Sequence, residues 1–149
     1  MSLEQDIQQK TFRSDYQKAL LNILFTSNYL ITIVNDFFKP YHITRQQYNV
    51  MRIVKGQLPK AASIQLIRDR MLDKMSDASR IVERLRLKNM VKREISPDDK
   101  RIVHISITEE GLKLLESIEI HVEEMEKSIK NLSLEEAAQL NDLLDKIRG

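Results

Sequence analysis

Hydroxyl and cationic side chains gather in the middle of this 149-residue chain, and they have the clearest chemistry in it. Ser76, Ser79, Arg80 and Arg84 fall at spacings that a helix places on its outer side, opposite a set of apolar residues. Such groups donate hydrogen bonds to phosphate oxygens and to acceptors on base edges. The pattern predicts a helix that contacts DNA. Its predicted DNA-facing residues are Lys74, Ser76, Asp77, Ser79, Arg80 and Arg84.

Asp77 is the acidic member of that set, and a carboxylate cannot approach a phosphate cheaply. Two roles are open to it. Its carboxylate could accept a hydrogen bond from a cytosine amino group, or it could stabilise the positive N-terminus of its own helix. We favour helix stabilisation, because that role requires no particular DNA geometry.

A second charged cluster, Asp99, Lys100 and Arg101, follows a Ser-Pro-Asp turn sequence. Asp99 and Arg101 are two residues apart and project to the same side of an extended strand, so they can form an ion pair. A carboxylate that holds an arginine fork presents it already oriented to the narrow minor groove of DNA. An isolated exposed pair of this kind contributes little. Beside a basic helix, we favour the DNA-binding interpretation.

Charge is unevenly distributed along the chain, although the net charge is only +2. Residues 60–104 hold 12 Lys and Arg against 7 Asp and Glu, whereas residues 105–149 hold 5 against 11. This distribution predicts one surface that attracts a polyanion and another that is kept away from it. The alternative is ordinary solvated surface charge.

The composition excludes several classes of protein. The chain has no cysteine, which removes disulfides, thiolate metal sites and thiol-based redox sensing. Its three histidines, His42, His104 and His121, are far apart, and neither a nucleophile-base set nor a phosphate-binding glycine loop is present. We therefore expect no enzyme, no cofactor and no metal. With no long apolar run and no signal peptide, we expect a cytoplasmic protein without membrane contact.

The first half of the sequence predicts three helices. Apolar positions recur every three or four residues from Tyr16 to Phe37, which indicates a long amphipathic helix that ends at Pro40. Thr44 then opens a short helix that runs to Gly56, and Ser63 opens a third that includes Met71.

The second half predicts a helix that Asn89 ends in the left-handed conformation, and then two alternating strands around 91–95 and 103–107. The strands form a hairpin with a charged tip. A fifth helix begins at Thr108 and carries an apolar stripe as far as Ile129, and Ser133 opens a sixth.

Two short helices, a tight turn and a hairpin within residues 44–107 form the plan of a winged helix-turn-helix lobe. The predicted fold is mainly α with a small β-hairpin wing, and residues 1–149 form a single domain. Residues 1–40 and 108–149 carry apolar stripes that this small lobe cannot cover. We expect these flanking helices to form a homodimer. The alternative is that they pack only on their own subunit.

Four segments of the sequence resemble the MarR family of bacterial transcriptional regulators. They are Asp73–Leu85, Lys88–Arg93, Pro97–Arg101 and Ile107–Gly111. The resemblance implies a homodimer that represses, or occasionally activates, nearby genes from a near-palindromic operator. It also implies a recognition helix in the major groove and the wing arginine, Arg101, in the minor groove. Asn89 stands where the family usually has glycine, and Lys100 where it commonly has arginine.

The resemblance further implies a small-molecule pocket between the dimerisation helices and the DNA-binding lobe. Phe25, Tyr29, His42 and Tyr48 lie near that junction in sequence, although each could be ordinary core or surface. By analogy with the family, the effector would be a phenol or another apolar anion. The predicted function is a ligand-responsive, sequence-specific DNA-binding repressor. The alternative is a winged-helix adaptor for protein-protein interactions that lacks sequence-specific DNA binding.

Overall fold

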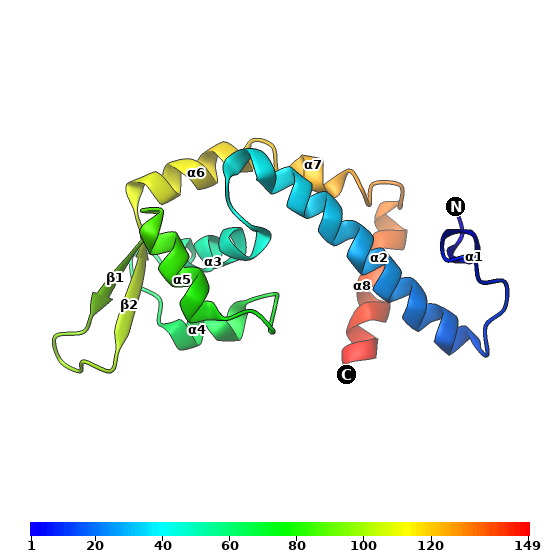
Figure 1. Cartoon of the computed structure of the whole chain (residues 1–149), viewed down its shortest axis with the longest axis horizontal. Coiled ribbons are helices and arrows are strands. Elements are labelled where there is room, and N and C mark those ends of the chain that lie inside the picture. Colours follow the sequence, from blue (N-terminus) through cyan, green and yellow to red (C-terminus); the bar gives the residue numbers. More distant parts are fainter.

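The computed structural model describes residues 1–149 as a helical chain with one β-hairpin (Figure 1). A lobe that carries the hairpin lies at one end, and a long helix leads away from it. The elements are α1 (Leu3–Asp6), α2 (Asp15–Phe38), the 3-10 helix η1 (Lys39–Tyr41), α3 (Arg45–Lys55), α4 (Ile64–Arg70), α5 (Ala78–Leu87), β1 (Val91–Ile95), β2 (Val103–Ile107), α6 (Glu109–Glu119), α7 (Glu123–Glu126) and α8 (Leu134–Arg148).

The hydrophobic core lies in the lobe, where α3, α4, α5 and the hairpin pack together. Its fully buried side chains include Met51 of α3, Ile67 of α4 and Leu85 of α5. Ile105 of β2 is also fully buried, and its backbone exchanges two hydrogen bonds of 2.8 Å with Ala62, which joins the segment before α4 to the edge of the hairpin. The winged helix-turn-helix fold predicted from the sequence is confirmed.

The predicted helix caps are confirmed because their chemistry is local. The hydroxyls of Thr44, Ser63, Thr108 and Ser133 each accept a hydrogen bond from a backbone N–H three residues later. At the end of α5, Asn89 has a φ of 60°, in the left-handed region where asparagine is the best substitute for glycine. These signals fix where four helices begin and where α5 stops.

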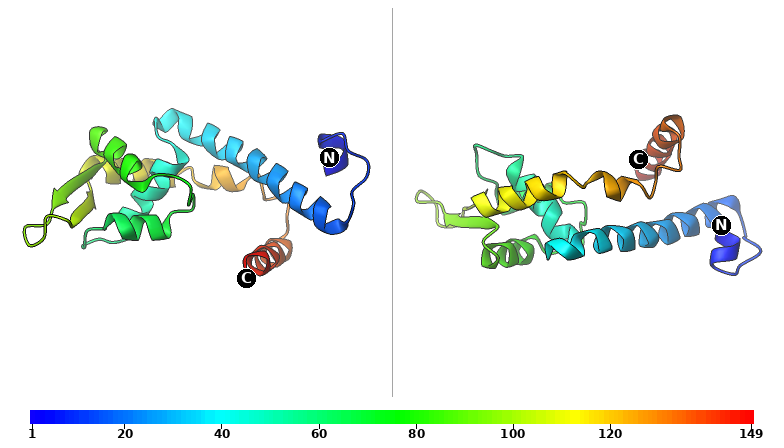
Figure 2. Two further views of the ribbon diagram at one scale, coloured as in Figure 1. Left: turned by 60° about the horizontal axis from the view of Figure 1, so that its bottom comes forward. Right: turned by 90° about the horizontal axis from the view of Figure 1, so that it is seen from above.

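The wing is an antiparallel hairpin in which Val91 pairs with Ile107 and Ile95 pairs with Val103. Its loop is closed by the Ser96 N–H, which donates to the Ile102 carbonyl at 2.9 Å. Both views of Figure 2 place the tip of the hairpin at the end of the molecule opposite α1. The wing therefore projects beyond the helices of the lobe.

Three local predictions were wrong in detail. Met71 is not inside the third helix but follows it in an extended conformation. Lys74 and Ser76 lie in the turn before α5, because Asp77 is the N-cap of that helix and the helix itself begins at Ala78. The fifth helix is not continuous: α6 ends at Glu119, and the next backbone hydrogen bonds reach back only three residues. Apolar spacings of three and four fit either kind of turn, so periodicity alone could not separate them.

The flanking helices leave most of their apolar side chains exposed. On α2, Leu20, Leu24 and Tyr29 are each more than half exposed, and no residue of α8 is buried. Both views of Figure 2 show α8 standing apart from α2. The assignment of residues 1–40 and 108–149 to dimerisation stays a prediction, and these helices have the uncovered apolar faces that it requires. No helix in the chain is both long enough and apolar enough to cross a membrane.

Candidate nucleic-acid interface and adjacent cavity

The outer side of α5 carries the hydroxyl and the two cations that the sequence assigned to it. Ser79, Arg80 and Arg84 are exposed, whereas Val82 and Leu85 are buried on the opposite side. Neither Arg80 nor Arg84 forms an ion pair within the chain. Both guanidinium groups are therefore free to contact phosphates or bases.

The acidic residue of α5 and the one that caps it already have hydrogen-bond partners within the chain. The Asp77 carboxylate accepts a hydrogen bond of 3.2 Å from the Arg80 N–H, which is the capping geometry. The Glu83 carboxylate accepts two hydrogen bonds from Arg86, at 2.7 and 2.9 Å, and this pairing lowers the pKa of Glu83. Helix stabilisation is thus the role that the geometry gives Asp77, and Glu83 is neutralised by its neighbour.

Lys74 contacts the protein itself. Its Nζ lies 3.3 Å from the Arg68 carbonyl oxygen and 2.5 Å from that of Asp69, in the last turn of α4. A cation at the C-terminus of a helix satisfies carbonyl groups that lack partners and is favoured by the helix dipole. The structure therefore shows Lys74 as a cap for α4, a role that the sequence pattern did not reveal. Ser76 is half-buried in the same turn.

The tip of the wing holds the ion pair that the sequence predicts. Arg101 donates from Nε to Asp99 Oδ1 and from Nη2 to Asp99 Oδ2, both at 3.1 Å, and its backbone N–H donates to the same carboxylate at 3.0 Å. These bonds lower the pKa of Asp99. The Arg101 side chain nevertheless remains 91% exposed. A planar cation is thus held in a fixed orientation at the end of the wing, next to the exposed Lys100.

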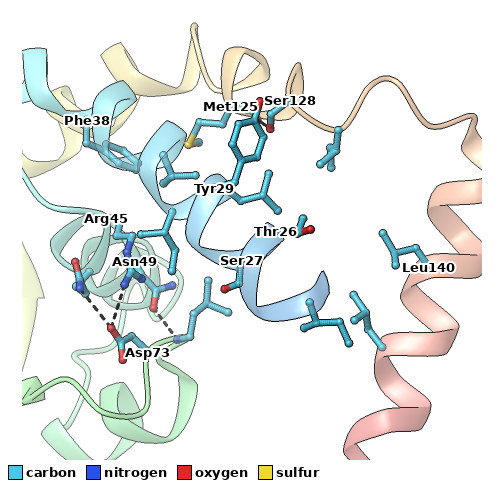
Figure 3. Close-up of a pocket in the computed structure, with 18 of the residues that line it drawn as sticks. Thr26, Ser27, Tyr29, Phe38, Arg45, Asn49, Asp73, Met125, Ser128 and Leu140 are labelled. Atoms are coloured by element: carbon cyan, nitrogen blue, oxygen red, sulfur yellow. Dashed lines mark hydrogen bonds and ion pairs between the residues drawn. The ribbon is translucent and has the colours of Figure 1, made fainter. Parts of the chain in front are cut away.

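A cavity of about 1010 Å³ lies between α2 and the winged-helix lobe (Figure 3). It is bounded by α2, the first turns of α3, the segment 71–73, the stretch around α7, and α8. Fifteen of its 24 lining residues are hydrophobic, and the only charged ones are Arg45 and Asp73. An apolar space with a few polar groups on one wall is typical of a small-molecule site.

Two of the four predicted pocket residues line this cavity. Tyr29 and Tyr48 do, whereas Phe25 and His42 do not. Phe25 is one helical turn before Tyr29 on the same side of α2, but only Tyr29 reaches the cavity. His42 lies beyond η1 with a left-handed φ of 55°, and its carbonyl accepts a hydrogen bond from Lys88.

Other lining residues carried no signal that could assign them to the cavity. Arg45 and Asp73 are 28 positions apart in sequence, and only the packing of α3 against the turn before α5 brings them together. Met125 reaches the cavity from α7, within the interrupted stretch of the predicted fifth helix.

Comparison with known proteins gives a consistent result. A family model for a winged helix DNA-binding domain matches residues 43–111. The HTH-type transcriptional regulator MhqR of Bacillus subtilis (strain 168) is 27% identical over 117 residues, which cover 76% of this chain and 78% of MhqR.

Two solved structures extend the comparison. The MarR transcription factor from Planctomyces limnophilus is 28% identical, with a TM-score of 0.70 over 91% of this chain and 98% of the other. A mutant MarR from E. coli in complex with operator DNA is 22% identical, with a TM-score of 0.78 over 93% of this chain and 99% of the other. The fold of the lobe and of the flanking helices is therefore shared with these regulators.

Proposed function

We propose that this chain, which is similar over most of its length to winged-helix transcription regulators of the MarR family, binds a specific DNA sequence and represses the genes beside that site. In this proposal α5 enters the major groove and the wing reaches the adjacent minor groove. The relatives are transcription regulators, not enzymes.

One observation carries the DNA-binding proposal: the Asp99–Arg101 pair at the wing tip. Its two side-chain hydrogen bonds of 3.1 Å orient the guanidinium, yet the Arg101 side chain is 91% exposed and forms no hydrogen bond or ion pair with any other residue. An exposed ion pair of this kind adds little to stability, so stability does not explain it. Orientation does explain it, because a fixed guanidinium loses less rotamer entropy when it enters a groove.

We propose that the chain forms a homodimer, because a single chain exposes more surface than a compact monomer of its mass. A compact monomer of 17.5 kDa exposes about 7900 Å², whereas this chain exposes 11182 Å². The excess is roughly 3300 Å² per chain, or about 6600 Å² for a pair of chains, which lies at the upper end of the total area that obligate dimers bury. The exposed apolar residues of α2 and α8 that do not line the cavity, among them Leu20, Leu24 and Leu143, identify where a second copy would pack. A two-fold dimer would place two copies of α5 about one DNA turn apart on a near-palindromic site.

We also propose that a small molecule in the cavity releases the DNA. The cavity has the size and the mostly apolar lining of a ligand site, and it touches both α2 and the turn that leads into α5. A ligand there would contact the dimerisation helix and the DNA-binding lobe at once. Such a ligand can shift the equilibrium between two arrangements of these parts.

The test of the DNA-binding proposal is the Arg101→Ala variant. We expect its affinity for the duplex upstream of its own gene to fall about tenfold to a hundredfold, because one oriented groove contact is lost at each half-site. Asp99→Asn should lower the affinity less, about two- to fivefold, since the Arg101 guanidinium is still present but is no longer held by a carboxylate. Fluorescence anisotropy at fixed salt measures both affinities, and sedimentation velocity should show an unchanged dimer.

Arg52→Ala is the matched control. It removes the same charge and also breaks a pair with a carboxylate, since Arg52 Nη1 lies 2.8 Å from Glu119 Oε2 at the end of α6. Figure 1 shows α6 on the side of the lobe away from the wing tip. Duplex affinity of this variant should stay within about twofold of the wild type. Equal losses for Arg101→Ala and Arg52→Ala would contradict a specific role for the wing.

A further inference from the structure

Two connections join the winged-helix lobe to the flanking helices, and neither of them is a continuous helix. The first runs from α2 through η1 and residues 42–44 into α3 (Figure 1). We call residues 39–44 the elbow. The second leaves the lobe through α6, which ends at Glu119 and continues in turns whose hydrogen bonds reach back three residues. The angle between α2 and the lobe therefore depends on side chains that support these connections.

Lys88 supports the elbow from the end of α5. Its ammonium group donates to the His42 carbonyl oxygen at 2.5 Å and to Gln47 Oε1 at 3.3 Å. Gln47 is only 4% exposed, and its Oε1 also accepts a hydrogen bond of 3.1 Å from the Thr44 N–H. Lys88 is itself the C-cap of α5. One ammonium group thus joins the end of α5 to the elbow and to the first turn of α3.

The elbow contains a backbone conformation that needs such support. His42 ends η1 with a φ of 55°, in the left-handed region. A residue with a Cβ keeps this conformation only where its surroundings fix it. The bond from Lys88 is a charge-assisted one, which is stronger than a bond between neutral groups. Lys88 therefore holds the elbow at the residue where the chain turns toward α3.

Aromatic packing also crosses the elbow, but it does not fix a direction. The Phe38 ring at the end of α2 lies with its centroid 4.7 Å from that of the Tyr48 ring of α3, and Phe38 is 1% exposed. Apolar contacts are non-directional and tolerate small rotations of one helix on another. A hydrogen bond weakens steeply as its angle departs from linear. The rings hold α2 against α3, and the bonds from Lys88 select one angle.

A small change of this angle is large at the surface that we propose for DNA binding. A lobe of about 65 residues is roughly 25 Å across. A rotation of about 10° at the elbow therefore moves its far side by about 4 Å, compared with a rise of about 3.4 Å for one base pair. In a two-fold dimer both lobes would rotate, so the distance between the two α5 helices would change by up to about two base pairs.

We propose that Lys88 is a positioning residue that sets the spacing between the two half-sites that the dimer accepts. This inference rests on the proposed function, because it names what fixes the distance between the α5 helices of the proposed dimer. With Lys88 in place, the lobe keeps one angle to α2 and the dimer accepts one spacing. Without Lys88, the elbow takes a range of angles, and the protein also binds duplexes whose half-sites lie closer together or further apart.

The experiment compares the native duplex with two duplexes in which one base pair is added or removed between the half-sites. Wild-type protein should bind the native duplex at least about tenfold more tightly than either altered duplex, as measured by fluorescence anisotropy at fixed salt. Lys88→Met keeps the length of the side chain and removes its donors, so this ratio should fall to about threefold or less. Lys88→Arg keeps a charged donor and should retain most of the ratio. A wild-type ratio in Lys88→Met would overturn the proposal.

The ratio of affinities separates positioning from plain electrostatics. Loss of a cation weakens binding to all three duplexes by about the same factor, so by itself it leaves the ratio unchanged. Lys55→Met is the matched control, because Lys55 is exposed in the last turn of α3 and its side chain forms no hydrogen bond or ion pair. This control should keep the wild-type ratio. Equal loss of the ratio in Lys55→Met and Lys88→Met would overturn the proposal.

A distance between two spin labels tests the elbow without DNA. The chain has no cysteine, so Asp15→Cys at the start of α2 and Arg70→Cys at the end of α4 provide one defined pair of labels. Dilution with unlabelled chain removes distances between subunits. Double electron-electron resonance should show a distance distribution that becomes broader, or shifts by several ångströms, when Lys88→Met is added.

The spin-label result distinguishes failure of this inference from failure of the proposed function. An unchanged distance distribution in Lys88→Met would overturn the role of Lys88, even if the wild type binds its duplex. A broader distribution in a protein that binds no duplex would support Lys88 as the support of the elbow and would reject the DNA-binding proposal.

Discussion

Replacement of Gly111 by alanine is expected to destabilise the protein by about 2–4 kcal/mol, the range of a severe overpacking change. A Cβ at this position would lie 2.3 Å from the Met90 carbonyl oxygen and 2.8 Å from Ile107 Cδ1. Gly111 sits in the first turn of α6, where that helix packs directly against the junction of α5 and the wing. The clash is with backbone, which cannot rotate away as a side chain can.

The Met90 oxygen cannot move because Thr108 holds it. The Thr108 N–H donates to it at 3.1 Å. The Thr108 hydroxyl lies 2.7 Å from the Asn89 carbonyl oxygen and 3.0 Å from that of Met90, and its oxygen accepts from the Gly111 N–H at 3.0 Å. Relief of the clash would therefore break the cap of α6 and the wing junction together. A substitution at Gly111 is predicted to disturb the position of the hairpin as well as the stability of the lobe.

Urea denaturation followed by circular dichroism measures the effect of Gly111→Ala. Gly56→Ala is the matched control, because a Cβ at Gly56 meets nothing closer than 3.4 Å and its φ of −64° suits alanine. The control should change the free energy of unfolding by less than about 1 kcal/mol. If Gly111→Ala unfolds at the same urea concentration as the wild type, the close packing of α6 on the wing junction is wrong.

Leu143→Glu is expected to dissociate the proposed homodimer and to remove most of the specific DNA binding that we propose for it. Leu143 lies on α8 and is 52% exposed in the single chain, so a carboxylate there costs the monomer little. Burial of the same carboxylate in a dimer interface without a partner costs several kcal/mol, on the order of a hundredfold or more in the dimer dissociation constant. A monomer reads only one half-site, so duplex affinity falls steeply.

Sedimentation velocity, with anisotropy on the same samples, measures this prediction. Ala138→Glu adds the same charge to the other side of α8, away from the apolar stripe that contains Leu140 and Leu144, and should stay a dimer. Thermal melting at low concentration checks that the Leu143→Glu monomer remains folded. A Leu143→Glu protein that is still dimeric would show that α8 is not in the interface.

Much of the local structure could be predicted from the sequence because its determinants lie close together in the chain. The caps at Thr44 and Ser133 follow from spacings of three residues, and the Asp99–Arg101 pair follows from a spacing of two. The left-handed backbone conformation of Asn89 and the alternation of apolar and polar residues in the strands also depend only on residues that are close in sequence. Such features are decided by bonds between near neighbours, which leaves tertiary packing little to override.

The cavity could not be predicted in the same way, because its polar wall joins residues distant in sequence. Arg45 meets Asp73 across 28 positions, and nothing in either residue's neighbourhood indicates the contact. Lys74 resembles a DNA-binding cation in sequence, yet the turn brings its ammonium back to the carbonyls at the end of α4. The sequence shows that these side chains are charged. Which groups they contact depends on how the folded chain brings distant segments together.

Duplex binding by the wild-type protein over a salt series tests the central claim most directly. The probes are the intergenic DNA next to its own gene and a scrambled duplex of equal length and composition. We predict nanomolar affinity for the native duplex, at least about a thousandfold preference over the scrambled one, and a steep fall of affinity with salt. Equal affinity for the two duplexes, or no binding even at low salt, would contradict the account and favour a protein-binding adaptor.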